Sequence, residues 1–181
     1  MMTTEDQILT AAALLLEKDG VEAVTTRAVC QAAGVTAPTL YHHFGDKDGL
    51  LRAVVAQGVN AFMAQKRANR QTADAVADLR RGWDGWIAFA LERPKLFRLM
   101  IESTRSDPSA SQEAFVIMRG IVERLATESR LTTDVDTAAR TIWAASNGVL
   151  TLFMQGTPAA EIKPSSELLF DALIGKLVRP K

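Results

Sequence analysis

Cysteine is almost absent from this chain of 181 residues. The single residue Cys30 excludes an internal disulfide and a metal site built from several thiolates, and so small a thiol content fits a reducing compartment. No apolar run reaches the ~20 residues that a membrane-spanning helix needs. The first residues carry acids where a secretory signal would carry bases. We therefore expect a cytoplasmic protein with no membrane partner.

Net charge is also lacking, because 21 basic residues balance 21 acidic ones. The first 52 residues hold four bases (Lys18, Arg27, Lys47, Arg52) against seven acids. A broad basic patch for nucleic acid is therefore excluded in this segment. DNA binding would depend on donors placed locally, at helix ends and on a helix that faces a groove.

Signatures of catalysis are missing as well. The sequence has no glycine-rich phosphate loop, no nucleophile elbow, and no Glu or His placed on an apolar face as a general base would be. His42 and His43 are adjacent, so on a helix they point about 100° apart and lack a third ligand at a useful spacing. We expect no catalytic residue, no bound metal and no cofactor.

Helical periodicity dominates the chain, and no alternating run demands a strand. We predict an all-α fold of about nine helices, with a capping box at Thr4 and Gln7 and a linker at residues 67–72. Residues 103–111 are expected to form a loop, and 156–164 a connection. The predicted helices span residues 4–20, 25–34, 36–44, 45–66, 73–92, 94–103, 111–130, 134–155 and 165–179.

Two short predicted helices, joined through Gly34 and Val35, have the arrangement of a helix-turn-helix over residues 25–44. The start of the first one offers backbone N–H groups, hydroxyls and a guanidinium to a DNA phosphate. The second presents small and aromatic side chains to the major groove, with Leu40 turned inward. The predicted DNA-binding residues are Thr25, Thr26, Arg27, Thr36, Ala37, Pro38, Thr39, Tyr41, His42, His43 and Lys47.

The second half is rich in Trp, Phe and Met. Each of these residues alone is most simply part of a helical core. Together, with polar neighbours such as Asn147, they are typical of an adaptable apolar pocket. The predicted effector pocket comprises Trp83, Trp86, Phe89, Phe97, Met100, Met118, Trp143 and Asn147.

The motifs Thr25-Thr26-Arg27, Ala33-Gly34-Val35, Pro38 to Phe44 and Lys47 to Leu51 stand in the order and spacing of one known family. Over residues 4–60 the chain resembles the DNA-binding domain of TetR/AcrR transcriptional regulators. The resemblance implies a DNA-binding domain at residues 4–62 and an effector-binding and dimerisation domain at 73–181. It also implies an Ω-shaped homodimer that acts as a repressor on a palindromic double-stranded operator and is released by a small apolar effector.

Dimerisation is expected through the last two long helices, which would pair as a four-helix bundle. The apolar residues expected there are Ile142, Val149, Leu152, Leu169, Leu173 and Leu177. The alternative hypothesis is a helical protein-interaction module whose helix-turn-helix never meets DNA. Retardation of DNA from the protein's own upstream region distinguishes the two.

Overall fold

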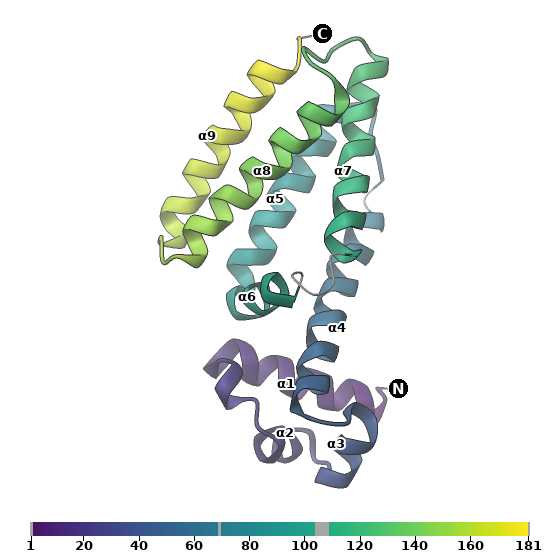
Figure 1. Ribbon diagram of the computed structural model, residues 1–181, viewed down its shortest axis with the longest axis vertical. Coiled ribbons are helices and arrows are strands. Elements are labelled where there is room, and N and C mark those ends of the chain that lie inside the picture. The colour runs from purple at the N-terminus through teal and green to yellow at the C-terminus, as the bar shows by residue number, and fades with distance from the viewer. Residues whose placement is uncertain (1, 69, 104–108, 181) are drawn as a thin grey trace. The chain divides into compact units, whose positions relative to one another are not determined.

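The computed structural model describes residues 2–68, 70–103 and 109–180. In these ranges the chain is all-α, as predicted: it has nine α-helices and no named strand, with one isolated bridge between Leu131 and Val178 (Figure 1). None of the described helices is long and apolar enough to cross a bilayer. The helices are α1 (Thr4–Asp19), α2 (Thr26–Ala33), α3 (Ala37–Phe44), α4 (Lys47–Ala68), α5 (Ala75–Glu92), α6 (Pro94–Ser103), α7 (Ser109–Thr127), α8 (Val135–Met154) and α9 (Ala159–Leu177), with a 3-10 turn η1 at Val21–Ala23.

The chain forms two compact units. The first contains Met1–Ala64 and Arg93–Ser106, so it includes α1 to α3, most of α4, and α6. The second contains Gln65–Glu92 and Asp107–Lys181, so it includes the last turn of α4 together with α5, α7, α8 and α9. Helix α6 thus belongs to the first unit although it follows α5 in the sequence.

The capping box of α1 lies one residue earlier than expected. The hydroxyl of Thr3 accepts a hydrogen bond from Asp6 N at 3.1 Å, and the Asp6 carboxylate accepts one from Thr3 N at 3.0 Å. The predicted pair of Thr4 and Gln7 is therefore wrong. A carboxylate is the stronger acceptor at the positive end of the helix, which favours the register that uses Asp6.

Within the first unit, α6 is held against α1 and α4. The Glu17 carboxylate accepts a hydrogen bond from Leu96 N at 2.8 Å, and Lys95 Nζ donates to the carbonyl of Lys18 at 2.7 Å. On α4, Gly58 lies so close to Leu96 that a Cβ atom there would stand 2.6 Å from Leu96 Cδ2. Glycine at this position therefore permits the close approach of α4 and α6.

The second unit packs α5, α7, α8 and α9 around a buried aromatic pair. Trp83 on α5 is 4% exposed, and its indole N–H donates to the Ser166 hydroxyl on α9 at 2.7 Å. The Phe170 ring lies edge-on to the Trp83 ring, with centroids 5.4 Å apart. Trp83 is thereby fixed between two helices with its polar atom satisfied.

In the second half of the chain, the structure differs from the prediction at the start of α9 and describes the predicted loop at residues 103–111 only in part. Helix α9 begins at Ala159, so the predicted start at Ser165 is wrong and Pro164 lies inside the helix. The proline removes one helical N–H, but the added turns bury Ile162, which is 1% exposed. The predicted loop at residues 103–111 falls partly outside the described residues, since 104–108 are not among them; α7 begins at Ser109.

Helices α8 and α9 each carry an exposed leucine. Leu152 is 50% exposed and Leu168 is 72% exposed. In contrast, Ile142, Val149 and Leu177 are only 5%, 5% and 8% exposed. The predicted dimer face is wrong at these three residues, because their side chains already belong to the core of their own unit.

Candidate nucleic-acid interface and ligand pocket

One glycine and two threonines define the ends of α2 and the start of α3. Gly34 ends α2 with φ 68° and ψ 32°, the left-handed conformation that favours glycine. The Thr25 hydroxyl caps α2 by accepting from Ala28 N at 3.2 Å. The Thr36 hydroxyl caps α3 and lies 2.9 Å from the Thr39 hydroxyl. These caps give α2 and α3 the defined ends that a helix-turn-helix needs.

Helix α3 is anchored at one residue and exposed over most of the rest. Leu40 is fully buried at 0% exposure, whereas Tyr41 is 48% exposed. Among the predicted groove-facing residues, Ala37 and Thr39 are half-buried, and the exposed ones are Thr36, Pro38, Tyr41, His42 and His43. The surface of α3 therefore offers methyl, hydroxyl and imidazole groups, which suit thymine methyls, base edges and phosphates.

The predicted phosphate contacts come from the starts of α2 and α4 and from Tyr41 in the middle of α3. Tyr41 on α3 and Thr26 on α2 meet through their hydroxyls at 3.3 Å, which joins the two helices at the predicted DNA surface. Thr25 and Arg27 are exposed at the start of α2, and Lys47 is the first residue of α4. Backbone N–H groups at helix starts bind anions, and the two cations add charge to them.

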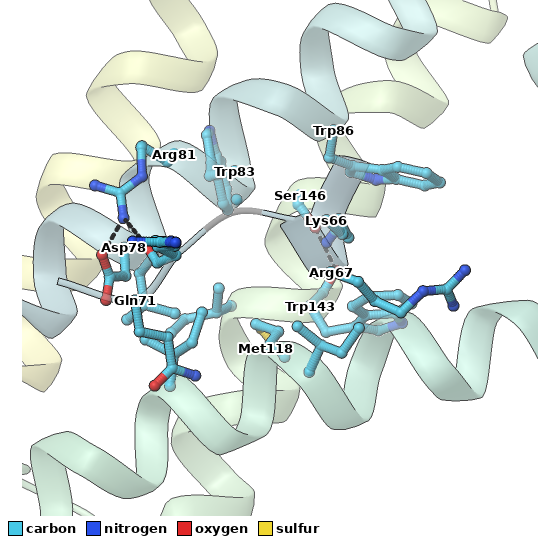
Figure 2. A pocket seen from close by; sticks show the side chains of 16 residues that line it. Lys66, Arg67, Gln71, Asp78, Arg81, Trp83, Trp86, Met118, Trp143 and Ser146 are labelled. Atoms are coloured by element: carbon cyan, nitrogen blue, oxygen red, sulfur yellow. Dashed lines mark hydrogen bonds and ion pairs between the residues drawn. The ribbon is translucent and has the colours of Figure 1, made fainter. Parts of the chain in front are cut away.

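The second unit contains a pocket of about 290 Å³. Its walls come from α5, α7 and α8. Its charged rim comes from the end of α4, the residues that follow α4, and Arg81 on α5 (Figure 2). The lining residues are Lys66, Arg67, Arg70, Gln71, Asp78, Leu79, Arg81, Gly82, Trp83, Trp86, Ile117, Met118, Ile121, Ile142, Trp143 and Ser146.

Four of the eight predicted effector residues line this pocket: Trp83, Trp86, Met118 and Trp143. Phe89 on α5 and Asn147 on α8 are half-buried and are not among the lining residues. The Asn147 side-chain amide instead donates to the Trp143 carbonyl at 2.8 Å.

Phe97 and Met100 lie on α6 in the first unit, where they are 1% and 6% exposed. Neither is among the lining residues of the pocket. Helical periodicity places such side chains on an inward face, but it does not tell a pocket wall from a solid core.

The charged rim of the pocket was not predicted. Lys66, Arg67, Arg70 and Arg81 line it, and Asp78 is the acid among the lining residues. The sequence did carry a sign of this rim, a group of bases where the fourth helix was expected to end and the linker to begin. Burial lowers the pKa of Lys66, because its ammonium loses hydration.

Asp78 is buried at the edge of the pocket and is held by a network of donors. Arg124 Nη1 lies 2.6 Å from one carboxylate oxygen, Arg81 pairs with the other, and Thr72 donates from its backbone N–H and its hydroxyl. Burial raises the pKa of Asp78, but these donors outweigh burial and hold the pKa well below its usual range. The carboxylate is thus charged and already neutralised within the protein.

Two sequence profiles match this chain. The profile described as bacterial regulatory proteins, tetR family, matches residues 8–54. The profile described as tetracyclin repressor-like, C-terminal domain, matches residues 79–177, which is more than half of the chain. The first match includes α2 and α3 completely, and the second includes most of the pocket walls.

Curated relatives match over part of this chain. The HTH-type transcriptional regulator UidR of Escherichia coli (strain K12) is 31% identical over 64 residues, which are 35% of this chain and 33% of UidR. BetI of Paraburkholderia xenovorans, also an HTH-type transcriptional regulator, is 30% identical over 118 residues, covering 55% of this chain and 60% of BetI. The match with UidR thus spans about a third of that protein's length.

Solved structures match over nearly the whole chain. SmeT, the repressor of the Stenotrophomonas maltophilia multidrug efflux pump SmeDEF, is 26% identical with a TM-score of 0.73, covering 98% of this chain and 91% of SmeT. A protein from Saccharomonospora viridis in complex with choline has a TM-score of 0.83 at 16% identity, covering 97% of this chain and 98% of its own. At 16% identity, the similarity to the Saccharomonospora viridis protein shows a shared fold only.

Proposed function

Because the chain belongs to the TetR family of bacterial regulatory proteins, and so is a DNA-binding transcriptional regulator, we propose that it acts as a repressor that a small, largely apolar effector releases from a palindromic operator. The observation that carries the proposal is the exposed surface of α3 beside the capped start of α2. This proposed function requires no catalytic residue.

The DNA-binding domain is proposed to comprise residues 4–62, and the effector-binding and dimerisation domain residues 73–181. The pocket supports an effector, since it combines tryptophan walls with a few polar groups, the usual composition of small-molecule sites. The repressor SmeT and the choline complex add support, as proteins of the same fold that are respectively named a repressor and bound to a small molecule. The alternative, an interaction module that does not bind DNA, leaves the polar exposed surface of α3 without a role.

We further propose a homodimer that pairs α8 and α9 with the same helices of a second copy. Leu152 on α8 and Leu168 on α9 are exposed, and burying them in a four-helix bundle removes apolar surface from water. A Cβ atom added at Gly148 or Gly175 would meet no atom of its own chain within 4 Å, although both residues lie in helix interiors. Small residues there would let a partner helix approach closely.

Effector binding is proposed to reach the DNA surface along α4 and α6. Helix α4 is continuous over 22 residues, from Lys47 at the proposed DNA surface to Lys66 and Arg67 at the pocket rim. Helix α6 directly follows α5, which supplies Trp83 and Trp86, and it contacts α1 and α4 through Leu96. An effector that favours one placement of these helices changes operator affinity by its differential affinity for the two states.

Trp143→Ala is expected to abolish most of the effector response and to leave effector-free operator binding within about twofold. Coupling energies of this kind are typically about 1 to 3 kcal/mol, which is roughly a 5- to 150-fold change in operator affinity. The measurement is a DNA titration with and without a compound selected from a thermal-shift screen of lipophilic molecules. Phe153→Ala is the matched control, because Phe153 is a half-buried aromatic residue on the same helix that does not line the pocket. Equal loss of both activities in Trp143→Ala would show that Trp143 is ordinary core.

A further inference from the structure

The inner wall of the pocket is built to hold hydrocarbon. The three tryptophans of the chain, Trp83, Trp86 and Trp143, all line it, together with isoleucines and Met118 (Figure 2). The indole N–H of Trp83 is taken by Ser166, and the Ser146 hydroxyl donates to the Trp143 carbonyl at 3.0 Å. These two polar groups of the wall are thus bonded within the protein, and the apolar side chains beside them suit an aliphatic or aromatic part of a ligand.

The rim of the same pocket is positive. Four cationic side chains line it, two from α4, one from the segment after α4 and one from α5, against the single carboxylate of Asp78. That carboxylate is 5% exposed and accepts hydrogen bonds from Arg124, Arg81 and Thr72. That carboxylate is thus already paired within the protein. Even with Glu113 paired to Arg67, the rim holds more cations than acids, which favours an anionic ligand.

Lys66 is the best placed of these cations to meet a ligand. Its side chain is half-buried, whereas Arg67, Arg70 and Arg81 are exposed. Among the exposed cations, Arg67 pairs with Glu113 and Arg81 with Asp78, so we place Arg70 beside the ligand as the second cation. Burial lowers the pKa of Lys66, and an anion beside the ammonium would offset that loss of hydration.

We infer that the ligand of this pocket is an amphiphilic carboxylate, with its hydrocarbon body among the three tryptophans and its carboxylate at Lys66 and Arg70. The inference rests on the proposed function, because it names the class of effector for the same site. It replaces a purely apolar effector with one that carries a single negative charge at one end. A quaternary ammonium of the same length would suit the aromatic wall but would be repelled by the rim.

The test is a head-group series on the full chain without DNA: octanoate, octanol and octyltrimethylammonium. Tryptophan fluorescence reports binding directly, because every tryptophan lines the pocket, and calorimetry confirms the affinities. Octanoate is expected to bind about tenfold or more tightly than either of the other two, as charge-assisted hydrogen bonds exceed neutral ones. Lys66→Gln should lower octanoate affinity about tenfold and leave octanol within twofold, while Lys66→Arg should retain octanoate binding.

Arg140→Gln is the control, because Arg140 is a cation on α8 with a 71% exposed side chain that does not line the pocket. It should change none of the three affinities.

The inference is overturned if octanol or octyltrimethylammonium binds as tightly as octanoate, if Lys66→Gln weakens all three equally, or if no probe binds at millimolar concentration. Octanoate that binds without altering operator affinity would instead refute the proposed release mechanism and leave the ligand class standing. A neutral compound that releases the operator would refute the ligand class and leave the proposed release mechanism standing.

Discussion

Lys47→Ala and Tyr41→Phe are each expected to weaken binding to every DNA sequence about tenfold, because each removes a phosphate contact from both copies of the dimer. For Lys47→Ala the slope of log affinity against log salt should fall by roughly two, one for each copy. Tyr41→Phe also breaks the 3.3 Å contact with the Thr26 hydroxyl that joins α3 to α2. The measurement is a salt-dependent titration with operator and with unrelated DNA.

Thr39→Ala and His42→Ala are expected to act differently, by changing the preference among operator sequences at the bases they face by about 1 to 3 kcal/mol. Arg98→Ala provides a matched control, since Arg98 is an exposed cation on α6, outside the proposed DNA surface. Should Lys47→Ala, Tyr41→Phe, Thr39→Ala and His42→Ala all bind like the parent protein at matched salt, the assigned surface would be wrong.

The double variant Leu152→Glu/Leu168→Glu is expected to be monomeric and to lose operator affinity by about 100-fold or more, because a monomer engages one half-site where a dimer engages two. Both side chains are at least half exposed in the single chain, so the substitutions should leave its fold intact. Sedimentation at micromolar concentration and circular dichroism report the two properties separately.

Leu14→Glu is the matched control for this variant. Leu14 is a 67% exposed leucine on α1, a helix of the first unit, whereas α8 and α9 belong to the second. It should leave the oligomeric state unchanged. A double variant that still sediments as a dimer would place the interface elsewhere.

The helix-turn-helix could be predicted closely because its signals are local. Thr25, Gly34 and Thr36 set helix ends through their own backbone and hydroxyl chemistry, and the structure uses all three as caps. The start of α9 could not be predicted in this way. Pro164 reads locally as a breaker, but burial of Ile162 in the second unit, a tertiary effect, extends the helix through it.

The pocket and the dimer face were harder for the same reason. Trp83 and Phe97 look alike in sequence, yet one lines the pocket and the other belongs to the first unit. Val149 and Leu152 are three residues apart on α8, and only the structure shows that the first is buried and the second half exposed. Lys66 lines the pocket because the fold brings residues of α5 and α7 together with the end of α4. No local sequence pattern predicts such a tertiary arrangement.

The central claim, that this regulator binds a two-fold symmetric operator, is tested most directly by selecting bound sequences from random DNA with the full-length chain and footprinting the enriched site. The account predicts an inverted repeat whose half-sites lie about one helical turn apart, roughly 34 to 36 Å, each read by one copy of α3. A single unrepeated half-site, or no enriched sequence at all, would contradict it and favour the interaction module.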